Sequence, residues 1–288
     1  MTPRSLRLTG ADGHPLHLLE WSQSGVPMLL LHGFANDAHV WDDFAPAVAP
    51  YYRTLALDQR GHGDSGHDPE LRYEHDSMAR DAIAALDALG IERVVLVGHS
   101  MGGRVSMRFA KRHPERLAGL VIVDAGPELD MRGVLRIRLD AEAKTDPSFA
   151  SVDEYERVLA RAYPLAPSAV VARLARHGLR TRADGRLVPK TDPAFAKNWG
   201  KIPPEEAARR SAEETAILWE ALRGTPCPAL VVRGAASDVL SPETAERMAE
   251  EALPRGTLAV VPRAGHSVMI DNPEGFRDAV LRFVVGDA

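Results

Sequence analysis

VVLVGHSMGG, residues 94–103, is the most informative segment of this 288-residue chain. Residues 94–97 are all apolar, as expected of a strand buried on both faces, and residues 100–112 have the pattern of a helix. Between them, Gly98-His99-Ser100-Met101-Gly102 places a serine in the turn from strand to helix, among small residues. This context indicates a nucleophilic serine, because the sharp turn exposes the hydroxyl at the N-terminus of the helix.

Strand-like and helix-like segments alternate on both sides of this turn. The turn signal Ala11-Asp12-Gly13 predicts a hairpin of residues 5–9 and 16–21. Further strands are expected at residues 28–31, 54–57, 94–97, 120–123, 229–233 and 258–261. Helices are expected at residues 41–48, 76–89, 100–112, 242–252 and 273–284. We therefore predict an α/β protein with an eight-stranded, mostly parallel sheet flanked by helices.

A long segment between the sixth and seventh strands interrupts this alternation. Residues 126–226 contain three helical patterns, of which the first begins with the capping box Ser151-Val152-Asp153-Glu154. A connection of this length is unusual in a compact domain unless it is functional. We expect a helical cap, or lid, at 126–226, inserted into a core made of residues 1–125 and 227–288.

A serine hydroxyl needs a base that removes its proton, and His266 is the best candidate among 11 histidines. It follows the last predicted strand in Ala264-Gly265-His266-Ser267, at the edge of the sheet where ligands bind in open α/β folds. The base needs a carboxylate in turn. Asp238 follows the seventh strand and gives the chain order Ser, Asp, His, which favours it as the acid, whereas Asp124 after the sixth strand remains the alternative.

Two backbone N–H groups are expected to bind the oxyanion that forms when the serine attacks a carbonyl. One belongs to Met101, the residue after the nucleophile. The other belongs to Phe34, in the glycine-containing loop His32-Gly33-Phe34 after the third strand.

Together these segments resemble the α/β-hydrolase superfamily, in particular its serine esterase, C–C hydrolase and haloperoxidase-like branch. The resemblance rests on His32-Gly33-Phe34, on residues 58–65 (DQRGHGDS), on residues 98–103, and on Asp238 and His266. It implies a carboxylic ester hydrolase that works through a Ser100–His266–Asp238 catalytic triad and an acyl-enzyme. A C–C bond or enol-lactone hydrolase, or a slow-turnover small-molecule receptor of the same fold, is the alternative.

The substrate is expected to be a small to medium ester or a related acyl compound. Phe34, Met101, Trp199 and Trp219 are candidate substrate-binding residues. The apolar character of the expected cap and of the residues near the catalytic loops favours an uncharged acyl group. Several arginines of the cap leave a carboxylate as the alternative: Arg132, Arg136, Arg138, Arg173 and Arg176.

Composition argues against several other classes of protein. The net charge of −5 and the lack of a basic block give no indication of nucleic-acid binding. The single Cys227 excludes an intramolecular disulfide, and the chain has neither a signal-peptide pattern nor an apolar run long enough to span a membrane. The single cysteine and the missing signal-peptide pattern are typical of a cytoplasmic enzyme, which we expect here. Because no group of His, Cys, Asp or Glu residues has metal-ligand spacing, we expect neither a metal nor a cofactor.

Overall fold

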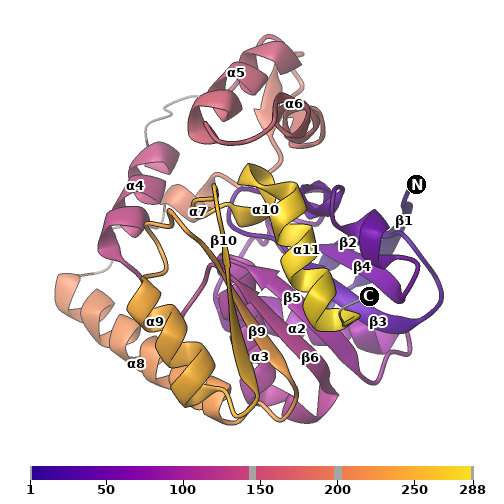
Figure 1. Ribbon diagram of the computed structural model, residues 1–288. Helices are drawn as coiled ribbons and strands as arrows, with labels where there is room; N and C mark the ends of the chain where they lie inside the picture. Colours follow the sequence, from indigo (N-terminus) through magenta and orange to yellow (C-terminus); the bar gives the residue numbers. More distant parts are fainter. Residues whose placement is uncertain (1, 143–146, 198–202, 287–288) are drawn as a thin grey trace.

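The computed structural model describes residues 2–142, 147–197 and 203–286, and a large central sheet dominates it (Figure 1). The sheet has eight strands: Arg4–Thr9 (β1), Pro15–Glu20 (β2), Val26–Leu31 (β3), Tyr52–Asp58 (β4), Val94–His99 (β5), Leu117–Val123 (β6), Ala229–Gly234 (β9) and Gly256–Val261 (β10). Their order across the sheet is β1-β2-β4-β3-β5-β6-β9-β10, and only β2 runs against its neighbours. The predicted fold class is confirmed.

Helices cover both faces of this sheet. They are His75–Ala88 (α2), Met101–Arg112 (α3), Pro204–Arg223 (α8) and Pro242–Glu246 (α9) on one face, and Ala45–Val48 (α1), Val268–Asp271 (α10) and Pro273–Val284 (α11) on the other. Strand side chains alternate between the two cores: Val94 and Leu96 of β5 pack with the first set, Val95 and Val97 with the second. No helix in the described parts of the chain is long and apolar enough to cross a membrane.

The prediction of one helix at residues 41–48 is wrong. The structure has a 3₁₀ turn at Ala38–Trp41, a break, and then the single turn α1. Pro46 lies in the first turn of α1. Proline tolerates that position, but it has no N–H to donate to the turn before it, so one continuous helix through residue 46 is disfavoured.

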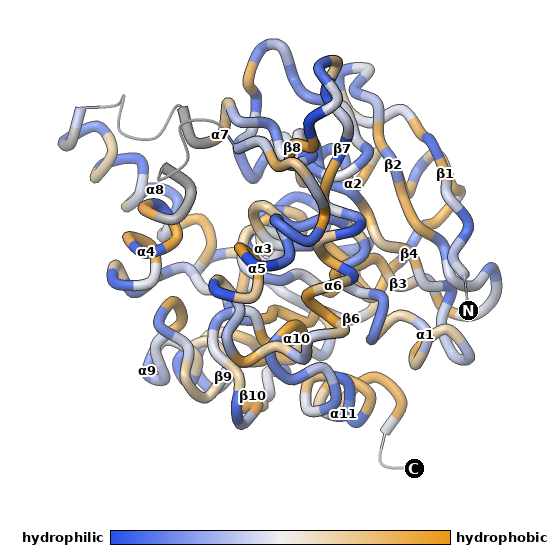
Figure 2. Tube along the Cα trace, turned by 90° about the horizontal axis from the view of Figure 1, so that it is seen from above, coloured by the Kyte–Doolittle hydropathy of each residue, from blue (hydrophilic) through white to orange (hydrophobic). Residues whose placement is uncertain are grey.

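The chain between β6 and β9 is mostly helical, and we call residues 126–226 the insert. It contains Met131–Glu142 (α4), Val152–Ala162 (α5), Ser168–His177 (α6), a hairpin of Leu179–Thr181 (β7) and Leu187–Pro189 (β8), Ala194–Lys197 (α7), and α8. Helices α5 and α6 lie above the sheet in Figure 1 and across β6 and α10 in Figure 2. By contrast, α8 packs against α3, so the last part of the insert belongs to the helical layer of the core.

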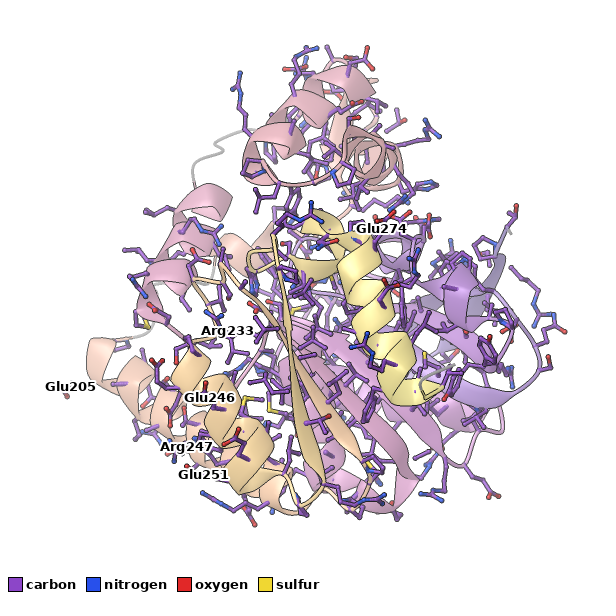
Figure 3. All side chains as sticks on the ribbon, viewed as in Figure 1. Glu205, Arg233, Glu246, Arg247, Glu251 and Glu274 are labelled. Carbon is purple, nitrogen blue, oxygen red and sulfur yellow. The ribbon has the colours of Figure 1, made fainter. Side chains whose placement is uncertain are left out.

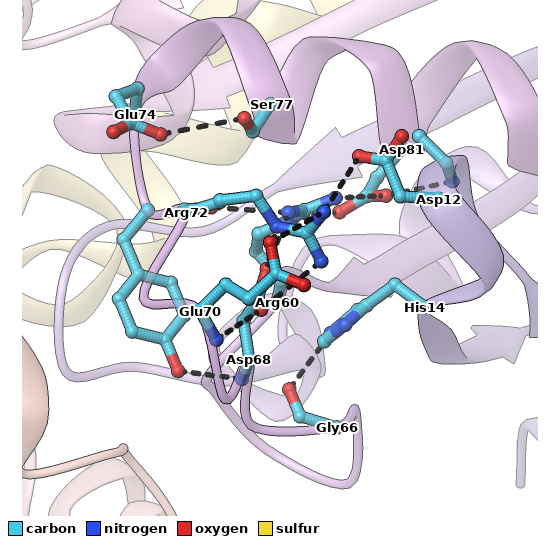
Figure 4. A network of polar contacts seen from close by, with 12 residues as sticks. Asp12, His14, Arg60, Gly66, Asp68, Glu70, Arg72, Glu74, Ser77 and Asp81 are labelled. Carbon is cyan, nitrogen blue, oxygen red and sulfur yellow. Dashed lines mark hydrogen bonds and ion pairs between the residues drawn. The ribbon is translucent and has the colours of Figure 1, made fainter.

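A buried ion-pair network fastens the loop after β4 to helix α2 (Figure 4). The Arg60 side chain is fully buried; its guanidinium donates to both carboxylate oxygens of Asp81, at 2.6 and 2.8 Å, and to Asp68 at 3.0 Å. We therefore interpret residues 58–65, which contain Arg60, as a structural turn and not as part of the catalytic machinery.

Replacing Arg60 is therefore expected to destabilise the fold. Arg60→Met should lower the free energy of unfolding by about 3–5 kcal/mol, because it leaves buried carboxylates without their partner. Urea unfolding followed by circular dichroism measures this. The control is Arg80→Met, which removes a partly exposed pair with Asp12 and should cost at most about 1 kcal/mol. Equal losses in the two variants would contradict the expectation.

Candidate active site

Ser100 sits in a strained turn between β5 and α3. Its φ of 52° and ψ of −115° are rare for a residue with a side chain, and such strain is concentrated at functional sites. The turn brings α3 very close to the sheet: a Cβ on Gly102 would lie 2.3 Å from the carbonyl oxygen of Leu31, and one on Gly98 would lie 2.3 Å from that of Gly102. Glycine is thus required at both positions. The geometry agrees with the sharp turn from strand to helix that the sequence predicts.

His266 reaches Ser100 from the loop after β10. Its Nε2 lies 2.8 Å from Ser100 Oγ, which is hydrogen-bonding distance. The loop is anchored by the N–H of Gly265, which donates to Asp271 at 2.8 Å, and by the N–H of Ala236, which donates to the carbonyl of Ala264. The His266 side chain is 9% exposed, so it is largely shielded from water.

The partner of His266 differs from the one predicted. Asp124, and not Asp238, accepts from Nδ1 of His266, at 2.8 Å and with its side chain fully buried. Asp238 is instead paired with Arg136 of α4, at 2.7 and 2.9 Å, and the Arg136 guanidinium lowers the pKa of that carboxyl. The prediction of Asp238 as the histidine's partner is wrong, and the alternative, Asp124, occupies that place.

Backbone geometry explains why Asp124, and not Asp238, bonds His266. Asp124 has a φ of 46°, which turns the chain sharply at the end of β6 and directs the carboxylate toward β9, where it accepts the N–H of Gly234 at 3.0 Å. In the loop after β9, Ser237 is the residue whose side chain points inward, to Asp124. Asp238, the next residue, therefore points away from the site.

The two expected oxyanion donors lie next to the nucleophile. Met101 is the first residue of α3, where backbone N–H groups have no partner within the helix. Gly33, just before Phe34, approaches Ser100 so closely that an added Cβ would lie 3.2 Å from the serine Cβ and 2.7 Å from Nδ1 of His99. The loop of Phe34 therefore borders the serine.

Two buried histidines hold these loops in place. His99 Nε2 lies 2.9 Å from the carbonyl oxygen of His266, to which it donates, and burial lowers the pKa of His99 to about 3, so that the ring is neutral. His32 donates from Nδ1 to the carbonyl of Gly33 at 2.7 Å and accepts the N–H of Gln59 at 3.0 Å. Both side chains brace the site through backbone groups.

The remaining predicted binding residues have different positions. Phe34 and Met101 are half-buried beside Ser100. Trp219 of α8 is part of the core, where its indole N–H donates to Glu128 at 2.9 Å and Arg247 stacks over its ring, so the structure does not support it as a substrate-binding residue. Trp199 lies outside the described residues.

Two groups of side chains in the described parts of the chain are close enough together to share a metal ion: His39 with Asp42 and His177, and His17 with Asp58 and Asp64. Neither contains a member of the Ser100 site. In the first, Nδ1 of His39 already bonds Asp42 at 3.0 Å and its ring stacks on His177. In the second, His17 and Asp58 share a buried bond of 2.7 Å.

Comparison with known proteins agrees with this architecture. The profile of one family, described as alpha/beta hydrolase fold, matches residues 26–273. A 2-(acetamidomethylene)succinate hydrolase of Mesorhizobium japonicum and a 2-hydroxymuconate semialdehyde hydrolase of a Pseudomonas species are each 29% identical, over 91% of this chain and 88% of the relative. A crystal structure of E-2-(acetamidomethylene)succinate hydrolase superimposes with a TM-score of 0.84 at 27% identity, covering 98% of this chain and 99% of the other.

Proposed function

This chain belongs to the α/β-hydrolase family, and we propose that it is a serine hydrolase that cleaves a carboxylic ester or a related acyl bond through a Ser100–His266–Asp124 triad. One observation carries the proposal: the continuous hydrogen-bonded path from Ser100 Oγ through both nitrogens of His266 to Asp124. Relatives over nearly the full chain are hydrolases by name.

Each member of the triad has a separate task. His266 accepts the Ser100 proton at Nε2, and the serine oxygen attacks the substrate carbonyl to give a tetrahedral intermediate. Asp124 keeps the Nδ1 proton in place and stabilises the imidazolium that forms. His266 then gives its proton to the leaving group, and a water activated in the same way releases the acyl group from Ser100.

The backbone supplies the charge stabilisation. In this proposal the N–H groups of Met101 and Phe34 donate to the developing oxyanion, and the N-terminus of α3, which begins at Met101, adds its partial positive charge. Donors fixed by folding need no reorganisation when the charge appears, which is why such groups contribute several kcal/mol to catalysis.

A test of the proposal is covalent trapping. With p-nitrophenyl acetate, we expect a stoichiometric burst of p-nitrophenolate and a mass increase of one acetyl group on the peptide that contains Ser100. Steady turnover after the burst supports an esterase, whereas a burst followed by near-silence supports the alternative receptor. Absence of a burst, or labelling at another residue, would contradict the proposed nucleophile.

The substrate that we propose carries a carboxylate near the bond that is cleaved. Arg136 projects from α4 of the insert, and its side chain is 47% exposed. Burial raises the pKa of Asp271, which anchors the His266 loop, and the positive charge of Arg136 opposes that rise. Its partner Asp238 is itself 37% exposed, so a substrate carboxylate can replace it on the guanidinium. The relatives above act on a succinate derivative and a muconate semialdehyde, which are both acids.

Arg136→Met is expected to separate acidic from neutral substrates. The KM for a monosuccinyl ester should rise about tenfold, because a charge-assisted hydrogen bond is lost, while kcat/KM for a neutral acetyl ester should stay within about twofold. Steady-state kinetics with the two esters measures this. Arg132→Met, at an 84% exposed arginine of the same helix, is the control. Equal losses on both esters would rule out a role of Arg136 in carboxylate recognition.

A further inference from the structure

We infer that Ser237 is a positioning residue for catalysis: its hydroxyl fixes Asp124 in the orientation from which that carboxylate holds His266. The inference rests on the proposed function and adds a fourth side chain to its machinery. Ser237 lies in the loop between β9 and α9, on a different strand connection from each member of the triad.

The contacts of the Ser237 hydroxyl define its direction. Its oxygen lies 2.5 Å from Oδ2 of Asp124, the same oxygen that accepts from His266. The N–H groups of Val239 and Leu240 both point to this hydroxyl, each at 3.2 Å. A hydroxyl has one proton and two lone pairs, so a hydroxyl that accepts from two amides has its proton left for the carboxylate.

Asp124 needs such a donor because its terminal torsion is soft. The carboxylate of an aspartate rotates over a broad range about χ2. Here Gly234 holds one oxygen through its N–H, while Ser237 and His266 both donate to the other. Without Ser237, the oxygen that faces His266 has the histidine as its single partner among these three. The plane of the carboxylate would then follow the imidazole instead of fixing it.

The loop that carries Ser237 is itself held rigidly. Arg233, labelled in Figure 3, lies near the end of β9 and is buried. Its guanidinium donates to three carbonyls of the loop, those of Leu240 at 2.8 Å, Ser237 at 3.2 Å and Ala235 at 3.3 Å. From the insert, the N–H of Gly133 donates to the carbonyl of Asp238 at 3.0 Å. A hydroxyl on a loop fastened from both sides is suited to hold a catalytic carboxylate.

The experiment is a double-mutant cycle on p-nitrophenyl acetate hydrolysis with Ser237→Ala, Asp124→Asn and the double variant. We expect Ser237→Ala to lower kcat about tenfold with KM changed less than about twofold, since an orientation is lost and not a substrate contact. In the Asp124→Asn background, the same Ser237→Ala change should have an effect of less than about twofold, because it then has no carboxylate to orient.

Two further variants separate this role from a structural one. Ser237→Thr keeps the hydroxyl and should retain at least a third of the kcat. Ser241→Ala removes the cap of α9 in the same loop, where the hydroxyl accepts the N–H of Thr244 without touching Asp124, and should leave kcat within about twofold. A kcat of Ser237→Ala within twofold of the parent, or a tenfold loss that persists in the Asp124→Asn background, would overturn the inference. Neither result would affect the proposed function, which fails separately if Ser100→Ala remains active.

Discussion

Ser100→Ala is expected to abolish ester hydrolysis almost completely, with kcat reduced on the order of 10⁶-fold. The reason is that Ser100 Oγ lies 2.8 Å from His266 Nε2 and is held in the strained turn before α3, so it is the hydroxyl from which this base can take a proton. Steady-state kinetics with p-nitrophenyl acetate, on protein whose circular dichroism and melting temperature match those of the parent, measures the loss.

Ser106→Ala is the matched control for this variant. Ser106 lies on α3, the helix that follows Ser100, is buried, and donates its hydroxyl to the carbonyl of Gly102. Its loss should change kcat by less than about tenfold, as expected for a residue that supports the helix without touching substrate. A Ser100→Ala protein that keeps more than a few per cent of the parent activity would show that another residue performs the chemistry.

The fold could be predicted from the sequence because its signals are local. The central strands of the parallel sheet contain short apolar runs that are buried on both faces, as residues 94–97 illustrate, whereas the edge strand β10 is partly exposed. The serine turn is equally local, since the glycines that permit close approach lie within five residues of Ser100. His266 could be placed because it lies in the short loop after the last strand, which ends at Val261.

The carboxylate could not be predicted with the same success, because its choice depends on side-chain direction in loops. Asp124 and Asp238 both follow parallel strands and emerge at the same edge of the sheet. The sequence does not show that residue 124 adopts a positive φ, or that in the second loop residue 237 points inward and residue 238 outward. The chain order Ser100, Asp238, His266 favoured Asp238, but this order did not identify the carboxylate that bonds His266.

Two other features of the structure could not be predicted from the sequence for a related reason. The ion pair of Asp238 with Arg136 joins a core loop to the first helix of the insert, and the two residues are 102 positions apart in the sequence. No local sequence pattern predicts such a pair. Trp219 was a candidate substrate-binding residue because an apolar ring on an amphipathic helix suits a pocket wall and a core equally well; the structure places α8 against α3 and Trp219 in the core. Long-range packing decides both cases.

Asp124→Asn is expected to lower kcat on p-nitrophenyl acetate by about 10⁴-fold, the loss seen when the corresponding aspartate of a serine protease is changed to asparagine. An asparagine amide can donate to Nδ1 of His266 and so stabilise the tautomer that carries its proton on Nε2. That tautomer cannot accept the proton of Ser100. The carboxylate of Asp238, held by Arg136, does not take its place.

Asp238→Asn is the matched variant, because it makes the same chemical change one loop away. We expect its kcat on the same neutral ester to stay within about threefold of the parent, since Asp238 is partly exposed and bonds Arg136 rather than His266. Both proteins are compared in one buffer, with melting temperatures as a check on folding. If Asp238→Asn is the inactive protein and Asp124→Asn turns over normally, the acid of the triad lies after β9 and the hydrogen bond between His266 and Asp124 is not the one used in catalysis. If the two single variants are mildly impaired and only the combined variant is inactive, either carboxylate can orient the histidine, and the exclusive role proposed for Asp124 is wrong.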